Sequence, residues 1–215
     1  MRLRRDPDDT DAVFEIFRAL PGSGVDTAYI EFAHSKVGLR ILRERSVLLD
    51  KLSDRAWLKS LPEGSLGQTY FDFTSQEKIT ADGLVEASQA PEDHRSNRDP
   101  DEQLFYERLR DMHDLEHVTT GYGRDLVGEA SILTFDLSQR WYTGLAVICA
   151  LAWIEGTKET RRMQRSAWRR AKRAKWMGTA DWERHLEEPL EQVREELQLG
   201  SQPYYAAERS SRAPK

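Results

Sequence analysis

The chain has 215 residues, of which 39% are hydrophobic and 32% are charged, and its formal net charge at pH 7 is −5. This composition excludes fibrous and disordered chains and allows one large globular core. The acidic balance argues against general nucleic-acid binding, which normally uses a basic surface. A single cysteine, Cys149, excludes an internal disulfide framework and fits a reducing compartment. The N-terminus MRLRRDPDDT turns acidic before an apolar stretch forms, so we expect no signal peptide and a cytoplasmic protein.

Helical periodicity prevails in the first half of the chain. Residues 11–20 place apolar side chains at helical spacing until Pro21-Gly22 ends the pattern, and residues 30–52 continue in the same style. After Pro62 and Gly64, Ser65 can cap a short helix within residues 61–73. Residues 89–101, with two prolines and several charges, are interpreted as an exposed connection between two helical halves.

The second half is also helical. The pattern resumes at residue 102, is interrupted after His117, and is expected to begin again at about residue 124. Residues 143–154 form the longest apolar run, which is too short to span a bilayer and predicts a buried helix. A basic helix follows, then an amphipathic helix over about residues 181–199 and a frayed tail over residues 200–215. We therefore predict an all-α fold, a single-domain helical bundle over residues 1–215 with a helix-turn-helix metal site.

The segment RDMHDLEHVTTGYGRDLVGE, residues 110–129, carries the candidate metal ligands. On a helix, His113 and His117 are four residues apart and face the same way, as in the H-E-x-x-H zinc helix. Asp114 lies beside them and can serve as a ligand or as a general base. Glu129 cannot join on one continuous helix, because the twelve residues after His117 would span about 18 Å. A reversal at the two glycines of this segment would bring Glu129 back on a second helix.

This set of donors predicts one divalent ion with a position open to water or substrate. Zinc is the first choice, and iron, manganese, cobalt and magnesium are alternatives. The plain alternative is a chance H-x-x-x-H on an exposed helix face, and Glu116 is interpreted as a solvated carboxylate. The neighbouring sequence GYGRDLVG lacks the spacing of a dinucleotide fingerprint and the Lys-Ser/Thr of a phosphate loop, so neither is predicted.

Residues 158–175 carry nine Lys or Arg and one acidic residue. Such a helix binds anionic lipid head groups or an anionic substrate group, and its plain alternative is a solvated face paired with the protein's own acids. RNA binding is a third, disfavoured alternative. A narrow opposite face, with Met163, Ala167, Ala171 and Ala174, would pack against another helix. The basic side chains that fall within an arc of about 120° are Lys158, Arg161, Arg162, Arg165, Arg169, Lys172 and Arg173.

HDLEH, followed by eleven residues and Glu129, resembles the H-D-x-x-H-x11-E signature of the coenzyme Q (ubiquinone) biosynthesis protein 4 family. The likeness extends to LPEGSLGQTYFDF, to RDPDEQLFYERLRDMHD and to AWRRAKRAKWMGTADWERHLEEPLEQVREEL, and so covers about residues 61–199. One departure lies between the histidines, where members of the family often carry bulky apolar residues and this chain has Leu115-Glu116.

The resemblance implies an all-helical fold, a divalent ion on His113, Asp114, His117 and Glu129, and a hydrophobic tunnel for a polyprenyl aromatic lipid. It also implies peripheral attachment to an anionic membrane surface, here the inner face of a bacterial membrane. Its expected partners are a second copy in a homodimer and other quinone-biosynthesis proteins.

The function that the resemblance implies is removal of the ring carboxylate at C1 of a prenylated hydroxybenzoate, with oxidation at that carbon; Asp114 is our candidate catalytic residue. The alternative is a non-catalytic prenyl-lipid-binding scaffold for a quinone-biosynthesis complex. A His-Asp metal phosphohydrolase that uses His94 and Asp136 is a third hypothesis, but it leaves Glu129 idle.

Overall fold

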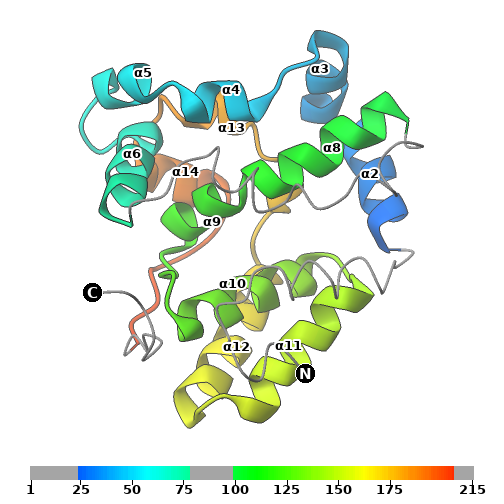
Figure 1. Cartoon of the computed structure of the whole chain (residues 1–215), viewed down its shortest axis with the longest axis vertical. Helices are drawn as coiled ribbons and strands as arrows, with labels where there is room; N and C mark the ends of the chain where they lie inside the picture. Colours follow the sequence, from blue (N-terminus) through cyan, green and yellow to red (C-terminus); the bar gives the residue numbers. More distant parts are fainter. Residues whose placement is uncertain (1–23, 78–98, 206–215) are drawn as a thin grey trace. The chain divides into compact units, whose positions relative to one another are not determined.

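The computed structural model describes residues 24–77 and 99–205. Over these ranges the secondary structure is helical, with no β-strand, which confirms the predicted all-α class (Figure 1). The described residues fall into two compact units: unit 1 holds residues 24–25, 120–174 and 199–205, and unit 2 holds residues 26–77, 99–119 and 175–198. The expectation of one domain stays a prediction. The helix expected over residues 11–20 and most of the connection over residues 89–101 lie outside the described residues.

Unit 2 begins with four short helices where the sequence pattern suggested a more continuous one. Ser35 accepts a hydrogen bond from the Gly38 amide and starts a new helix as its N-cap. Arg45 then takes a left-handed φ of 54°, which ends that helix. The helices are α2 (Gly24–His34), α3 (Lys36–Glu44), α4 (Leu48–Ser53) and α5 (Arg55–Ser60).

Helix α6 (Leu66–Gln76) confirms the cap predicted at Ser65, whose side chain accepts a hydrogen bond of 3.2 Å from the Gln68 amide. Its first turn is held by the C-terminal segment, since the Gly67 amide donates to the Leu186 carbonyl over 2.8 Å. A Cβ atom on Gly67 would stand 2.8 Å from that same oxygen, so the close approach requires glycine.

The chain from Lys175 to Gln198 returns to unit 2 and packs beside α8 (Pro100–Asp111). The single amphipathic helix expected over residues 181–199 is wrong. Two helices, α13 (Trp182–His185) and α14 (Leu190–Glu196), replace it after the 3-10 turn η2 (Met177–Thr179). The break falls at Pro189, which has no amide hydrogen to continue the first helix and serves as N-cap of the second.

Unit 1 is built from α10 (Leu126–Gln139), α11 (Thr143–Glu155) and α12 (Lys158–Ala171), and α10 packs against both of the others. Met163, Ala167 and Ala171 are buried, which confirms these three residues of the predicted packing face, whereas Ala174 is only half-buried.

The apolar run over residues 143–154 was expected to form a buried helix, and this is only half correct. Cys149 is buried as predicted, whereas Trp153 is exposed and Ile154 is 71% exposed. One side of α11 packs on unit 1, and its C-terminal end carries apolar side chains at the surface. Within the described ranges no helix has both the length and the apolar composition to cross a membrane.

Candidate metal centre

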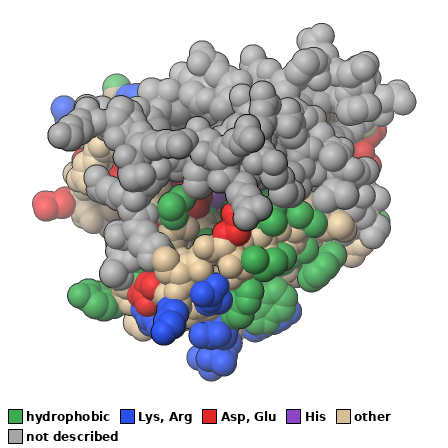
Figure 2. Space-filling model, turned by 60° about the horizontal axis from the view of Figure 1, so that its bottom comes forward, with side chains coloured by type: hydrophobic (Ala, Val, Ile, Leu, Met, Phe, Trp, Pro, Cys, Tyr) green, Lys and Arg blue, Asp and Glu red, His purple; other side chains and the backbone are tan. Residues whose placement is uncertain are grey.

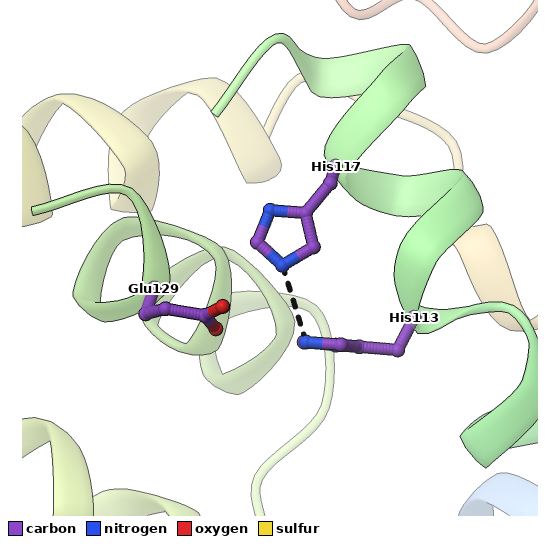
Figure 3. Close-up of side chains that lie close together, drawn as sticks. All are labelled: His113, His117 and Glu129. Carbon is purple, nitrogen blue, oxygen red and sulfur yellow. Dashed lines mark hydrogen bonds between the residues drawn. The ribbon is translucent and has the colours of Figure 1, made fainter. Parts of the chain in front are cut away.

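Helix α9 (His113–Thr120) carries the two histidines and follows a turn at Met112 that ends α8. The Nε2 atoms of His113 and His117 lie 3.2 Å apart, and the two rings are nearly perpendicular with centroids 4.8 Å apart (Figure 3). His117 is 1% exposed, and its ring stacks on Phe73 of α6 at a centroid distance of 6.1 Å. The helical spacing therefore brings both imidazoles to one point, as predicted.

The separation of the two nitrogen atoms can be tested against a metal ion. Zinc–nitrogen bonds of about 2.0–2.1 Å at a tetrahedral angle place two ligand nitrogens roughly 3.3 Å apart. The Nε2 atoms of His113 and His117, which are hydrogen-bonded to each other, lie 3.2 Å apart, close to that distance. The pair therefore fits a divalent ion of zinc's size.

Two arginines bind the carbonyl groups at the C-terminal end of α9, where a helix leaves its last acceptors without partners. In unit 2, Arg194 of α14 donates to the carbonyls of Val118 and Thr119, each over 2.9 Å. In unit 1, Arg170 of α12 donates to the Thr120 carbonyl over 2.6 Å. Cations at this end of a helix also complement the helix dipole.

Asp114 is 5% exposed, and its carboxylate accepts no hydrogen bond from any described residue. It lies near Tyr70 of α6, where burial first and the charge of Asp114 second raise the pKa of the Tyr70 hydroxyl. Tyr70 therefore keeps its proton at neutral pH. A buried carboxylate without a donor is costly unless a cation or a proton compensates it. The ligand and base roles of Asp114 remain predictions.

Glu116 was interpreted as a solvated carboxylate, and this was wrong, because it is only 3% exposed. Helix α9 is buried on nearly all sides, because His113 is the one residue of this helix that is not buried. The departure from the family pattern between the histidines therefore places a carboxylate inside the protein.

Glu129 lies one turn into α10, which belongs to unit 1. Gly121 has a φ of +77°, a left-handed conformation that suits glycine at the predicted break after α9; the return of α10 beside α9 stays a prediction. Asp125 caps α10, and the Glu129 amide donates to its carbonyl over 2.8 Å. Arg124 approaches the Glu129 carboxylate, with 3.7 Å between Nε and Oε1. Figure 3 draws Glu129 with the two histidines; a ligand role for Glu129 stays a prediction.

The predicted basic face is divided by the structure. Arg162 pairs with Glu159 over 2.6 Å, as the alternative of internal ion pairing expected, and Arg161 donates to the Trp153 carbonyl. Helix α12 ends at Ala171, and Lys172 is its C-cap residue, whose amide donates to the Trp168 carbonyl over 3.3 Å. Of the seven side chains of the predicted basic face, six are exposed: Lys158, Arg162, Arg165, Arg169, Lys172 and Arg173.

A groove with a volume of about 460 Å³ lies among α10, α11 and α12 of unit 1. Arg165 stands over the Trp153 ring at 5.3 Å, and Lys172 over the Trp168 ring at 5.4 Å. In Figure 2, where the bottom of the view in Figure 1 is turned forward, basic side chains gather next to hydrophobic ones. Most of the lining is apolar: Leu137, Trp141, Ala146, Cys149, Ala150, Trp153 and Trp168, with Thr134, Gln164, Arg165 and Arg169 as the polar members.

The fold and the site together define an all-helical protein with a convergent histidine pair on a buried helix. The family model described as coenzyme Q (ubiquinone) biosynthesis protein Coq4 matches residues 6–203. The chain belongs to this family, as the sequence motif predicted.

Two curated relatives illustrate the similarity. The chain is 29% identical over 178 residues to the ubiquinone biosynthesis protein coq4, mitochondrial, of Schizosaccharomyces japonicus, covering 79% of this chain and 70% of that one. It is 30% identical over 177 residues to the COQ4 homolog, mitochondrial, of Rattus norvegicus, covering 77% of this chain and 62% of that one. The chain thus spans less than two thirds of the rat protein.

A crystal structure from Nostoc punctiforme, described as that of a proposed ubiquinone biosynthesis protein, shares the fold. Its TM-score is 0.67 at 19% identity, with 93% of each chain covered. At this identity the likeness supports the fold and nothing more specific.

Several residues that shape the site were not identified from the sequence. Phe73 and Arg194 reach it from helices that are distant in the chain, and isolated aromatic or basic residues carry no local signal of such a role.

Proposed function

We propose that this protein binds one divalent metal ion and acts on the aromatic head of a prenylated precursor in ubiquinone biosynthesis. The observation that carries the proposal is the 3.2 Å separation of the His113 and His117 Nε2 atoms on a buried helix. Family membership makes a role in coenzyme Q biosynthesis the natural setting for such a site.

Glu129 is the third ligand in this proposal, and Asp114 is a fourth ligand or a base. Support for Glu129 comes from the chain itself. Helix α9 ends at Thr120, Gly121 reverses the backbone with its positive φ, and α10 begins at Leu126. This short link allows the first turns of α10 to return toward α9. Two neutral imidazoles with carboxylates would balance a divalent ion, and zinc remains our first choice.

The prenyl tail would occupy the groove of unit 1. Its size, of about 460 Å³, and its tryptophan-rich lining fit an apolar chain. The binding energy of the tail would hold the aromatic head in place for the reaction. The exposed cations of α12 would bind anionic lipid head groups, which gives the protein a peripheral association with a membrane surface.

The proposed reaction breaks the bond between ring carbon C1 and the carboxylate. The deprotonated para hydroxyl increases the electron density at C1, so that a proton can add there; CO2 then leaves, and the electron pair of the broken bond returns to the ring. In an oxidative form O2 is the two-electron oxidant: a hydroxyl group replaces the carboxylate at C1, and O2 with one water molecule supplies that hydroxyl group and one molecule of hydrogen peroxide. A divalent ion bound by the histidines would supply Lewis-acid stabilisation to the oxygens of the substrate.

Asp114 is the residue proposed to move the proton. It is buried, it accepts no hydrogen bond from the described residues, and it adjoins His113 in the chain. A carboxylate at such a position can act as a general acid or base over a short distance. Asp114→Asn preserves the shape of the side chain and removes this capacity.

The test follows a labelled carboxyl carbon in a prenylated hydroxybenzoate, with purified, metal-loaded protein and no other enzyme present. We expect release of labelled CO2, and a comparison of assays with and without O2 distinguishes the simple decarboxylation from the oxidative one. The acid that lacks a prenyl tail should release little label. His113→Ala and His117→Ala should abolish metal binding and release together, while His34→Ala, at an exposed histidine of α2, should change neither.

Absence of label release from protein that carries its full complement of metal would rule out the enzymatic proposal. The lipid-binding scaffold would then account for the site, with a structural ion. Full metal occupancy in a protein lacking both His113 and His117 would contradict the metal centre itself.

A further inference from the structure

The hydroxyl group of Tyr205 bridges two parts of the turn that leads into α10. It donates a hydrogen bond to Asp125 Oδ2 over 2.8 Å and accepts one from the Gly123 amide, also over 2.8 Å. Its pKa is raised, chiefly by burial, so the phenol keeps the proton that it donates at neutral pH. Each group in this chain of two hydrogen bonds therefore has its proper donor or acceptor role.

Asp125 uses its other oxygen to cap α10. Asp125 Oδ1 accepts from the amides of Val127 and Gly128, over 3.0 and 3.3 Å. One carboxylate thus joins the first turn of α10 to Tyr205. Because the Glu129 amide donates to the Asp125 carbonyl in the same turn, the backbone of Glu129 is fixed by this cap.

The glycines of GYGRDLVG make room for the phenol. A Cβ atom on Gly128 would lie 2.7 Å from the Tyr205 hydroxyl oxygen and 1.9 Å from the Gly123 carbonyl oxygen. A Cβ atom on Gly123 would lie 3.2 Å from the same hydroxyl. Neither glycine has a positive φ, so their role here is close approach and not backbone conformation. This close approach gives two glycines of GYGRDLVG a structural role.

The segment that carries Tyr205 is held along its length in unit 1. Arg170 donates to the Leu199 carbonyl over 2.5 Å, and Arg162 donates to the Tyr204 carbonyl over 3.1 Å. The side chain of Gln202 lies against Gly121, where a Cβ atom would be 3.1 Å from it. The tail expected to be frayed from residue 200 is therefore ordered as far as Tyr205, which corrects that prediction for the described residues.

We propose that Tyr205 is a positioning residue for the metal centre: by joining the Gly123 amide to the Asp125 cap, it fixes the first turn of α10 and so the position of Glu129 as a ligand. This inference rests on the proposed function for the ligand role of Glu129. The family model ends at residue 203, so Tyr205 lies beyond the residues that it matches.

Tyr205→Phe removes the hydroxyl group and keeps the ring. Tyr204→Phe is the matched control, since Tyr204 is 94% exposed. Zinc affinity is measured by competition with a chromophoric chelator, and amide hydrogen exchange is followed at Gly123, Val127 and Gly128. Loss of a residue that supports a metal ligand typically weakens affinity by about 10- to 100-fold. Because Tyr205 acts through the backbone, we expect about a 10-fold loss, with faster exchange at the three amides and no change in Tyr204→Phe.

A second variant separates positioning from a general loss of structure. Asp125→Asn keeps a good N-cap residue but removes the carboxylate that accepts from Tyr205. If both variants act by breaking the same hydrogen bond, the double variant should bind zinc about as well as the weaker-binding single variant.

Unchanged zinc affinity in Tyr205→Phe, whether or not exchange becomes faster, would overturn the positioning role. Wild-type protein that binds no zinc or other divalent ion would instead overturn the proposed function and the ligand role of Glu129 with it. The two failures are therefore distinguishable from the wild-type titration alone.

Discussion

Cys149 shows at the scale of a single residue how burial controls chemistry. Its thiol is enclosed by unit 1, and burial raises its pKa to about 12. Because the raised pKa belongs to the folded state, the associated stability is fully present below the ordinary thiol pKa. It is lost as the pH rises through that value toward 12.

We expect the Cys149 thiol to react with a disulfide reagent at pH 8 about 1000-fold more slowly in the native protein than in denaturant. The reason is the smaller thiolate fraction that follows from the raised pKa. The measurement is the rate of absorbance change with a chromogenic disulfide. Comparable rates in the native and denatured proteins would show that the thiol is solvated in solution.

At the scale of elements, α12 presents exposed cations beside exposed tryptophans of the groove. Each cation near an anionic surface contributes about 1 kcal/mol at low salt. We expect Arg165→Glu with Arg169→Glu to weaken binding to anionic vesicles by at least about 30-fold, since two attractions of that size are lost and repulsion is added. Co-sedimentation over a series of salt concentrations measures this, and binding should also fade toward 1 M salt.

The control for this prediction makes the same change of charge elsewhere. Lys36 and Lys59 are exposed on α3 and α5 of unit 2, and reversing both to Glu alters the net charge equally. If this control reduces vesicle binding as much as the α12 variant does, net charge and not the basic face governs the interaction.

A buried ion pair joins α8 to α13 across a long stretch of sequence. Arg108 donates to both carboxylate oxygens of Glu183, over 2.5 and 2.9 Å, and to the Ala180 carbonyl over 2.9 Å. Both side chains are buried. A pair of this kind is costly to break, because the partner that remains is a buried, uncompensated charge.

We expect Arg108→Met to lower the free energy of unfolding by about 3–5 kcal/mol. Arg40→Met, which removes more exposed ion pairs with Asp181 and Glu44 and a longer contact of 3.9 Å with Glu183, should cost less than about 1 kcal/mol. Urea denaturation measures both, and the Arg108→Met/Glu183→Leu double variant should be less destabilised than Arg108→Met. Equal costs for Arg108→Met and Arg40→Met would contradict the importance assigned to burial.

At the scale of the whole molecule, a metal ion that binds only the folded protein adds to its stability. At a free concentration 100 times the dissociation constant, the gain is about 2.7 kcal/mol. For a chain of this length that gain corresponds to a rise in Tm of roughly 5–10 °C. We expect a chelator to lower the Tm by this amount in the wild type and in His34→Ala, and to have no effect on His113→Ala. Calorimetric scans with and without chelator test this. A chelator effect that survives in His113→Ala would place the stabilising ion at another site.

The sequence determined the local features of this protein. Its 3.6-residue periodicity predicted an all-helical chain, the H-x-x-x-H spacing predicted the convergent imidazoles, and Ser65 marked a helix cap that the structure confirms. These features depend on residues within about one or two turns of each other, where backbone geometry alone fixes which side chains meet. The family followed from the same motif.

Only the tertiary structure decided which distant residues would meet. It buried Glu116, matched Arg108 with Glu183 across 75 residues, placed Phe73 against His117 and brought Tyr205 to the cap of α10 across 80 residues. A lone Arg, Phe or Tyr is compatible with many surroundings, because helical periodicity states which face of a helix is apolar but not which partner covers it. The choice of partner is made when segments pack, since only then are the buried polar groups of one segment satisfied by those of another.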